Sequence, residues 1–485
     1  MGRIRYFSIV LGELGEMLTF ISPLTLFALL VAIVFREWDL LLPLAIVPLL
    51  FFGGGMILNS IPRHPGDVGF STALCSVALL WLSFAVVSCI PFMIVLDIPF
   101  TDALFEAMAG WTGTGFSLLQ DIDLLPRSLL FWRTYIQWLG GLAIISLSLT
   151  IAFRSNLDTM APFRPESRSE RIIPGIVANG KEIWAVYILL TVISVGIIIV
   201  ARVPLWDALN LALSGISTGG FIPVAGGVSS YNNTTLEFLL IPVMVMGSIP
   251  FSLFYMTYQN RKISFFSDEQ VRILIYFLCF GSLVVIADLL FIARYAPAEA
   301  VRQGLFMMTA VMSTTGFQNA NLYLFPSVTL VFLTMFMFVG GSSGSTAGGL
   351  HLSRIALGYR GIVWWFRRAF VRSTVLVPFR YQGRNVPIEV AEPELSKSML
   401  VIILSVITVF IATMVILQVH IISCDVTVLV FDIVSALSSC GVSAGYVGPT
   451  MPLVSKWVFI FVMWIGRLDV IPVIVLFTGL LKGSD

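Results

Sequence analysis

The sequence has few charged residues and lacks the motifs of soluble nucleotide-binding and redox proteins. Only 11% of its 485 residues are charged and 58% are hydrophobic, whereas soluble domains carry roughly 25% charged residues. No GxxxxGK[ST] loop is present, which excludes ATP binding through that motif. The five cysteines show no CxxC spacing, which favours inert thiols, and the net charge of +1 indicates neither a nucleic-acid nor an acidic partner.

The apolar residues form blocks that are long enough to cross a bilayer. A spanning helix needs about 20 consecutive apolar residues, and backbone groups in hydrocarbon must be satisfied within helices or closed barrels. Blocks of this length indicate helices, so we expect an all-α, multi-pass protein of the cytoplasmic membrane, surrounded by lipid. The ten expected spans are 17–35, 40–61, 68–95, 131–153, 182–201, 237–257, 272–292, 328–350, 399–421 and 456–478.

Lys and Arg are distributed unevenly between the two sides of this arrangement. Most of them fall in connections on the side of the N-terminus, which include the longest basic loop, 354–397. Because positive residues mark cytoplasmic loops, we expect both termini to be cytoplasmic. The loop 354–397 is the expected docking surface for a soluble partner, and an ordinary solvated loop is the alternative.

Four outer connections are unusual for exposed loops. Each contains an apolar, helix-like stretch followed by a cluster of Gly, Thr and Ser, and the stretch from Gln303 to Ser353 has no Asp, Glu, Lys or Arg. Non-helical backbone at membrane depth is tolerated only where it is buried in protein or lines a water-filled cavity. We therefore expect a short helix in each connection that enters the membrane, turns on glycine and leaves again.

Alignment of these connections on their glycines predicts a fourfold internal repeat. Ten residues before the turn glycine stand Phe105, Phe306 and Phe431, with Leu209 in the second copy. Four span–dip–span units in one chain suggest a pseudo-fourfold ring that follows a two-helix preface. The expected divisions are 1–62 for the preface and 63–160, 161–262, 263–370 and 371–485 for the four units.

The four turns have the chemistry of a cation filter. Glycine orients successive carbonyls without steric cost, and a ring of carbonyls can replace the hydration shell of a cation. The turns contain no Asp or Glu, so a dehydrated monovalent cation is favoured over a divalent one. In one copy alone, such residues usually pack or cap helices; four matched copies favour a filter. The turns are Thr112-Gly113-Thr114-Gly115, Ile216-Ser217-Thr218-Gly219, Ser313-Thr314-Thr315-Gly316 and Ser438-Ser439-Cys440-Gly441.

A second glycine-rich run lies inside the eighth expected span. Its five glycines among ten residues are incompatible with a stable helix, which favours a flexible flap below the filter over a close-packing seam of small residues. The run is Gly340-Gly341-Ser342-Ser343-Gly344-Ser345-Thr346-Ala347-Gly348-Gly349.

Arg467 lies near the middle of the last expected span, where a charge costs at least ~2.5–3.5 kcal/mol. Asp469 is two positions away and points to another face of a helix. Arg467 is therefore expected to face a water-filled interior and to act as an electrostatic gate. A buried ion pair with another helix is the alternative.

Two other classes of protein compete with the pore. Residues 341–344 resemble the nucleophile turn of intramembrane serine proteases, which need a histidine base within hydrogen-bond reach. His351 is near the cytoplasmic end of its span and His420 near the outer end of the ninth, so this remains a remote alternative. A non-conducting receptor or scaffold would carry no cation flux.

Several of these motifs together resemble the potassium-transporter superfamily that includes bacterial TrkH and KtrB and the plant HKT proteins. The resemblance covers essentially the whole chain and is closest to the TrkH branch. The motifs are Phe105-Glu106-Ala107 through Gly115, Phe131-Trp132-Arg133, Gln137-Trp138-Leu139-Gly140-Gly141, Ser217-Thr218-Gly219-Gly220-Phe221, Ser313-Thr314-Thr315-Gly316-Phe317, the run 340–349 and Gly466-Arg467-Leu468.

The resemblance implies a K⁺-translocating homodimer, gated by a cytosolic nucleotide-binding ring similar to TrkA, with no organic cofactor. It implies K⁺ contacts at one glycine in each unit, and glycine in all four is similar to the K⁺-selective pattern. Na⁺ or poorly selective translocation is the alternative, because Gly113 replaces the usual threonine and no proline follows Gly441. His351 replaces a common lysine at the end of the run 340–349, a departure that concerns gating. The implied K⁺ positions are Gly115, Gly219, Gly316 and Gly441.

Overall fold

The computed structural model describes residues 3–61, 70–152, 172–260, 265–372, 377–381, 384–419 and 425–482. Most of them lie in helices, which confirms the expected all-α polytopic fold. Among these residues, the only sheet pairs two short antiparallel strands, β1 (Phe379–Tyr381) and β2 (Arg384–Val386). The divisions expected after residues 62, 160 and 262 lie outside the described residues.

The N-terminal preface is a pair of closely packed spans. It contains α1 (Arg3–Thr25), α2 (Phe27–Val34), the 3-10 turn η1 (Trp38–Leu40) and α3 (Leu41–Asn59). The helices α1 and α2 together form one span, Tyr6–Val34. Two glycines allow α1 and α3 to approach each other: a Cβ atom on Gly55 would meet Thr19 Oγ1 and would lie 2.9 Å from Gly15 O. Small residues at such crossings let helix backbones pack tightly in a membrane.

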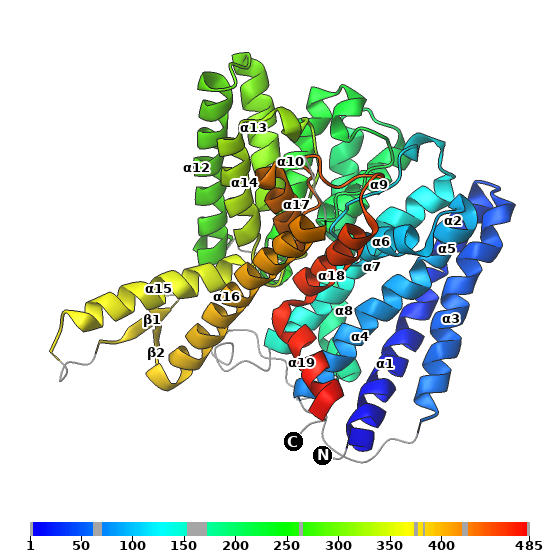
Figure 1. The fold of residues 1–485 in the computed structure, drawn as a ribbon, viewed down its shortest axis with the longest axis horizontal. Helices are drawn as coiled ribbons and strands as arrows, with labels where there is room; N and C mark the ends of the chain where they lie inside the picture. The colour runs from blue at the N-terminus through cyan, green and yellow to red at the C-terminus, as the bar shows by residue number, and fades with distance from the viewer. Residues whose placement is uncertain are drawn as a thin grey trace.

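Each of the four following units contains a pore helix between two other helical segments (Figure 1). The pore helix is shorter than both in the first, second and fourth units, whereas in the third α13 has 16 residues and the returning helix α14 has 13. The first long helices are α4 (Phe70–Ser88) with α5 (Ile90–Leu96), α8 (Ile172–Ile199), α12 (Glu269–Phe291) and α16 (Ile388–Val419). The short pore helices are α6 (Phe100–Trp111), α9 (Leu205–Ile216), α13 (Pro297–Met312) and α17 (Val426–Leu437). The returning helices are α7 (Arg127–Ala152), α10 (Thr234–Ser248), α14 (Ser327–Val339) and α18 (Leu453–Leu468).

Single-turn 3-10 helices are found near these units. The helices η2 (Ile122–Leu124), η4 (Val228–Tyr231) and η6 (Leu322–Leu324) follow the first three turns, and η5 (Phe265–Ser267) precedes α12. A proline occupies the N-cap position of α6 and α9, and Asp102 and Asp207 lie in the first helical turn.

Three of the expected spans are broken rather than continuous. The span expected at 237–257 bends by 90° between α10 and α11 (Phe251–Asn260). The one expected at 456–478 bends by 105° between α18 and α19 (Val470–Lys482). In the third unit, α14 ends at Val339 and a loop leads to α15 (Leu352–Ala369). Six of the described helices are long and apolar enough to cross a membrane, or eight if each bent pair is counted as one span.

The start of α1 and the end of α19 lie at the same end of the molecule (Figure 1). At this end α15, the two strands and the first half of α16 project sideways from the helical body. A small separate core, formed by Leu357, Phe379, Val386 and Ala391, joins α15 to the strands and α16.

We expect Gly55→Ala to lower the free energy of unfolding by about 1–3 kcal/mol, because the added methyl group overpacks the contact between α1 and α3. Gly54→Ala is the matched control: nothing lies within 4 Å of a Cβ at this position, and Ala is the better helix former. Thermal unfolding of the two variants in detergent would measure the difference. Equal stability of both variants would contradict the packing described for Gly55.

Candidate functional site

The four pore helices end in the same kind of turn. The residue after each C-terminal cap has a positive φ, and the glycine two positions later has a φ between 78° and 83°. The capping residues are Thr112, Ser217, Ser313 and Ser438. The residues after them are Gly113 (65°), Thr218 (50°), Thr314 (53°) and Ser439 (51°), and the turn glycines are Gly115, Gly220, Gly316 and Gly441.

The second turn is shifted by one residue from the sequence prediction. The backbone equivalent of Gly115 is Gly220 rather than Gly219, and Ile216 is the last residue of α9. The hydrogen bonds of the turns support this shifted alignment. Gly219, the residue before Gly220, donates its N–H to Ser214 O at 2.8 Å. The equivalent bonds run at 2.9 Å from Thr114 to Ala109, from Thr315 to Ala310 and from Cys440 to Ser435. Two adjacent glycines had left the sequence alignment ambiguous.

The turn glycines close the four units into a ring. A Cβ atom on each turn glycine would overlap a carbonyl oxygen of the next unit, and the fourth unit meets the first in the same way. The oxygen belongs to the residue that precedes the turn glycine of that next unit. The pairs of glycine and carbonyl are Gly115 with Gly219, Gly220 with Thr315, Gly316 with Cys440 and Gly441 with Thr114. A side chain at any turn glycine would therefore separate the turns, and the positive φ also favours glycine.

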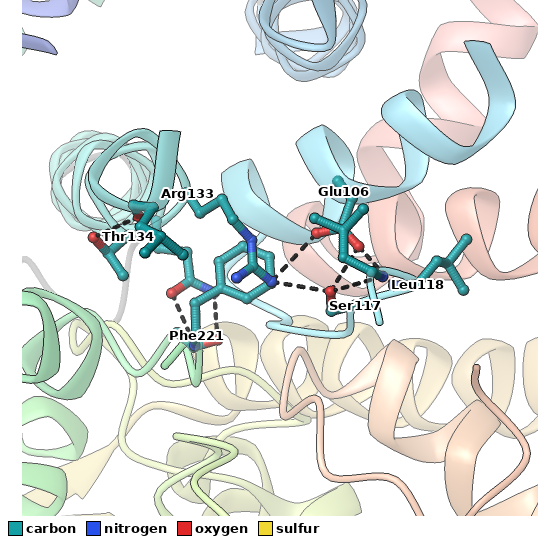
Figure 2. Close-up of polar contacts among 10 residues, drawn as sticks. Glu106, Ser117, Leu118, Arg133, Thr134 and Phe221 are labelled. Atoms are coloured by element: carbon teal, nitrogen blue, oxygen red, sulfur yellow. Dashed lines mark hydrogen bonds and ion pairs between the residues drawn. The ribbon is translucent and has the colours of Figure 1, made fainter. Parts of the chain in front are cut away.

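A buried carboxylate holds the chain segment that follows the turn of the first unit (Figure 2). Glu106 Oε1 accepts hydrogen bonds from Leu118 N–H (2.6 Å) and from the Ser117 hydroxyl (2.8 Å). Arg133 of α7 donates to Ser117 Oγ (3.0 Å) and to Glu106 Oε2 (3.4 Å). Its guanidinium also lies 4.2 Å from the centre of the Phe221 ring, so this ion pair links the first turn to the second.

The fourth unit has a carboxylate at the equivalent position. Asp432 accepts hydrogen bonds from the Ser443 hydroxyl (2.7 Å) and from the N–H groups of Ala444 (2.7 Å), Val447 (2.9 Å) and Tyr446 (3.1 Å). The hydroxyl and the first N–H stand where Ser117 and Leu118 stand in the first unit.

The other two units are braced from the returning helices. Gln137 of α7 donates to Gly219 O (2.5 Å) and accepts from Phe221 N–H (3.2 Å). In the third unit, Asn319 donates to Glu237 of α10 at 2.7 Å. Gln137 and Asn319 had no predicted role. The available signal was the repeated carboxylate in an apolar pore helix, nine residues before the turn glycine in the first and fourth units.

The glycine-rich run 340–349 is not helical and lies directly against the turns. Gly348 N–H donates to Thr314 Oγ1 (2.8 Å), and a Cβ atom on Gly348 would overlap Ser438 O. The Thr346 hydroxyl lies 2.9 Å from both Ile216 O and Gly247 O. The run therefore contacts the ends of the second, third and fourth pore helices.

Arg467 lies against this run at the end of α18. It is only 6% exposed, and its Nη1 donates to Thr346 O at 3.0 Å. Its Nε and Nη2 have no hydrogen-bond partner among the described residues. A Cβ atom on Gly113 would lie 3.6 Å from the guanidinium nitrogens, so the side chain points at the base of the first turn.

Asp469 is directed away from Arg467, as the sequence spacing predicted. Its carboxylate pairs with both terminal nitrogens of Arg354 on α15, at 2.9 and 2.5 Å. Asp469 has a φ of 69° and separates α18 from α19. The alternative, an ion pair of Arg467 with another helix, is not found among the described residues, whereas Asp469 forms one.

The residues of a serine protease do not come together around 341–344. Ser343 is exposed and its N–H donates to Gln270 Oε1 at 2.9 Å. His351 Nδ1 is buried and has no hydrogen-bond partner within the described part of the chain, and His420 lies outside that part. Among the described residues, no serine of this run is hydrogen-bonded to a histidine, which is the base that the mechanism needs.

Comparison with known proteins agrees with this architecture. The chain is 28% identical over 477 residues to an uncharacterised cation transporter of Methanocaldococcus jannaschii, which covers 97% of this chain and 95% of that protein. It is 26% identical to the Trk system potassium uptake protein TrkH of Halomonas elongata, over 83% and 84% of the two chains.

The fold is that of a solved membrane transporter. The crystal structure of the potassium transporter TrkH from Vibrio parahaemolyticus matches with a TM-score of 0.85 at 22% identity, over 98% of this chain and 99% of that one. Residues 56–483 match the TrkH family, described as cation transport proteins. The chain therefore belongs to the TrkH family, whose members are membrane transporters rather than enzymes.

Proposed function

We propose that this chain conducts K⁺ into the cell through one axial pore, with the ring of turns as its filter. The observation that carries this proposal is the closed contact of four equivalent glycines with four backbone carbonyls, in a ring without carboxylates. Carbonyl rings of this kind replace the hydration shell of a cation. The names of the Halomonas relative and of the Vibrio structure, which both specify potassium, support K⁺ as the ion.

We assign one carbonyl-lined ion site to the residues around Gly115, Gly220, Gly316 and Gly441, with Gly220 in place of the expected Gly219. A poorly selective or Na⁺-conducting pore is the second candidate, and one observation favours it. The position after the cap carries a hydroxyl group in three units, at Thr218, Thr314 and Ser439, but Gly113 has none. The first unit therefore contributes one ligand group fewer below the ring.

The gate in this proposal consists of the run 340–349 and Arg467. The run is buried against the second, third and fourth pore helices. Arg467 lies below the first turn, beside Gly113, and donates to Thr346 O of the run. A fixed positive charge below a carbonyl ring raises the barrier for a passing cation. Conduction then requires that the run and the arginine move aside.

The partners in this proposal are a second copy of the chain and a cytosolic nucleotide-binding ring similar to TrkA. The relatives are named as parts of a Trk system, which implies further components. The projecting arm of α15, the strands and α16 is the surface that we assign to the soluble partner (Figure 1). This assignment places both termini in the cytoplasm, as the distribution of Lys and Arg predicts.

We expect Gly115→Ser to lower the preference for K⁺ over Na⁺, because the added side chain overlaps Gly219 O and opens the ring. Flux of K⁺, Rb⁺ and Na⁺ into liposomes with purified protein would measure it, and Gly53→Ser, with open space around its Cβ, is the control. Equal ion ratios in the Ser variants of all four turn glycines would refute the filter. No cation flux in the wild type would favour a receptor or scaffold.

Removal of Ser345, Thr346 and Ala347 should raise K⁺ flux, because Thr346 contacts the end of the second pore helix through its hydroxyl and holds Arg467 through its carbonyl. The variant keeps the ring itself, so its ion ratios should match those of the wild type. Size-exclusion profiles would establish that it is folded. A folded variant with unchanged or reduced flux would instead identify the run as a packing seam.

Arg467→Ala should also raise K⁺ flux, since it removes the charge below the ring, whereas Arg467→Lys should stay near the wild-type rate. The alanine variant is expected to fold, because Arg467 has one hydrogen bond and no ion pair within the described residues. The same liposome assay, with thermal unfolding alongside, tests both variants. Lower flux or a loss of folding in Arg467→Ala would make the arginine a structural residue.

A further inference from the structure

In the first and fourth units, equivalent carboxylates hold the chain segment that follows the turn. The two units differ in whether a cation neutralises the charge of that carboxylate. Glu106 is paired with the guanidinium of Arg133 at 3.4 Å. Asp432 is fully buried, and among the described residues it has hydrogen-bond donors but no cationic partner. The first brace is therefore neutral overall, and the fourth carries a net negative charge.

The sequence explains the difference at one position of the returning helices. Arg133 is the seventh residue of α7, and its guanidinium lies over Phe221 of the next unit. The seventh residue of α18 is Phe459, whose ring packs 6.0 Å from Phe116 of the next unit. In both units this side chain packs on the phenylalanine that follows the turn glycine of the next unit. The side chain is a cation in the first unit and an uncharged ring in the fourth.

The other two units add no charge at these places. The residues nine positions before the turn glycines are Leu211 and Met307, and the seventh residues of the returning helices are Leu240 and Leu333. The brace of the third unit includes Glu237, which is paired with Arg302 at 3.7 Å. Among the described residues, Asp432 is thus the one carboxylate of these braces without a cationic partner.

The hydrogen bonds of Asp432 favour its ionised form. Three of its four donors are backbone N–H groups, from Ala444, Tyr446 and Val447, which cannot accept a proton in return. Hydrogen bonds donated to a carboxylate stabilise the charged state against the effect of burial. The charge acts through protein rather than water, so it is weakly screened at the ring.

We infer that Asp432 determines the cation affinity of the filter: its uncompensated charge strengthens binding in the ring, and strengthens it more for divalent than for monovalent cations. This inference rests on the proposed K⁺ filter and deepens it. Asp432 does not touch the ion in this assignment but acts across the fourth turn. A unit charge acting over roughly 10 Å at an effective dielectric constant of about 20 changes the affinity about tenfold for K⁺ and about a hundredfold for a divalent cation.

The test compares K⁺ affinity with block by Ba²⁺, a divalent cation of nearly the same radius as K⁺. Liposome flux gives the half-saturating K⁺ concentration and the Ba²⁺ concentration for half-block. Asp432→Asn should weaken K⁺ about tenfold and Ba²⁺ about a hundredfold, as calculated for one lost charge. For a lost charge, the fold-change in Ba²⁺ affinity is the square of the fold-change in K⁺ affinity. Structural damage to the turn gives no such relation.

Two variants of the first unit separate charge from bracing. The double variant Glu106→Gln with Arg133→Gln disrupts the equivalent brace without changing the net charge, and should leave the ratio of Ba²⁺ to K⁺ affinity unchanged. Arg133→Phe gives the first unit the uncharged ring of the fourth and leaves Glu106 uncompensated. It should strengthen Ba²⁺ block, an effect opposite in sign to that of Asp432→Asn and one that structural damage does not produce.

An equal loss of K⁺ and Ba²⁺ affinity in Asp432→Asn would overturn the inference, as would a ratio shifted to the same extent by the double variant. Weaker Ba²⁺ block in Arg133→Phe would also overturn it. This variant keeps the inference testable if Asp432→Asn does not fold. These results differ from a failure of the proposed function, which would be a wild-type protein without K⁺ flux.

Discussion

The structure depends on the contact between four turn glycines and four carbonyl oxygens. Each contact joins one unit to the next, and the last joins the fourth unit to the first, so the ring closes only if all four lack a Cβ atom. This requirement fixes the positions of the pore helices and, through them, of the longer helices around the ring. It also explains why the backbone of the turn has similar φ values in four units whose side chains differ widely.

The elements below the ring are held by the same turns. Thr314 and Ser438, at the ends of two pore helices, contact Gly348, and Ile216 at the end of a third contacts Thr346. Just beyond, Asp469 pairs with Arg354 at the base of the projecting arm. A connected series of contacts therefore runs from the ring through the glycine-rich run and α18 to the arm. In the proposed function, this series joins the partner surface to the gate.

The sequence predicted the parts of this fold that follow from composition and spacing. Long apolar blocks predicted the helices, and the repeated glycines predicted four matched turns. Spacing could not resolve Gly219 from Gly220, because the choice depends on which backbone adopts a positive φ against a neighbouring unit. It also missed the breaks after α10 and α18, since both halves of each bent pair are apolar and only tertiary contacts separate them.

The polar braces were missed for a related reason. A carboxylate in an apolar helix has no partner in the linear sequence, and Ser117 and Ser443 meet Glu106 and Asp432 only after each turn reverses the chain. The requirement for ring closure constrains the glycines and the caps, but it leaves the positions behind the turns free to differ. Those positions hold a neutral ion pair in one unit, an unpaired carboxylate in another and apolar side chains in two. The fourfold fold thus forms the ring, and the departures from fourfold symmetry set the charge around it.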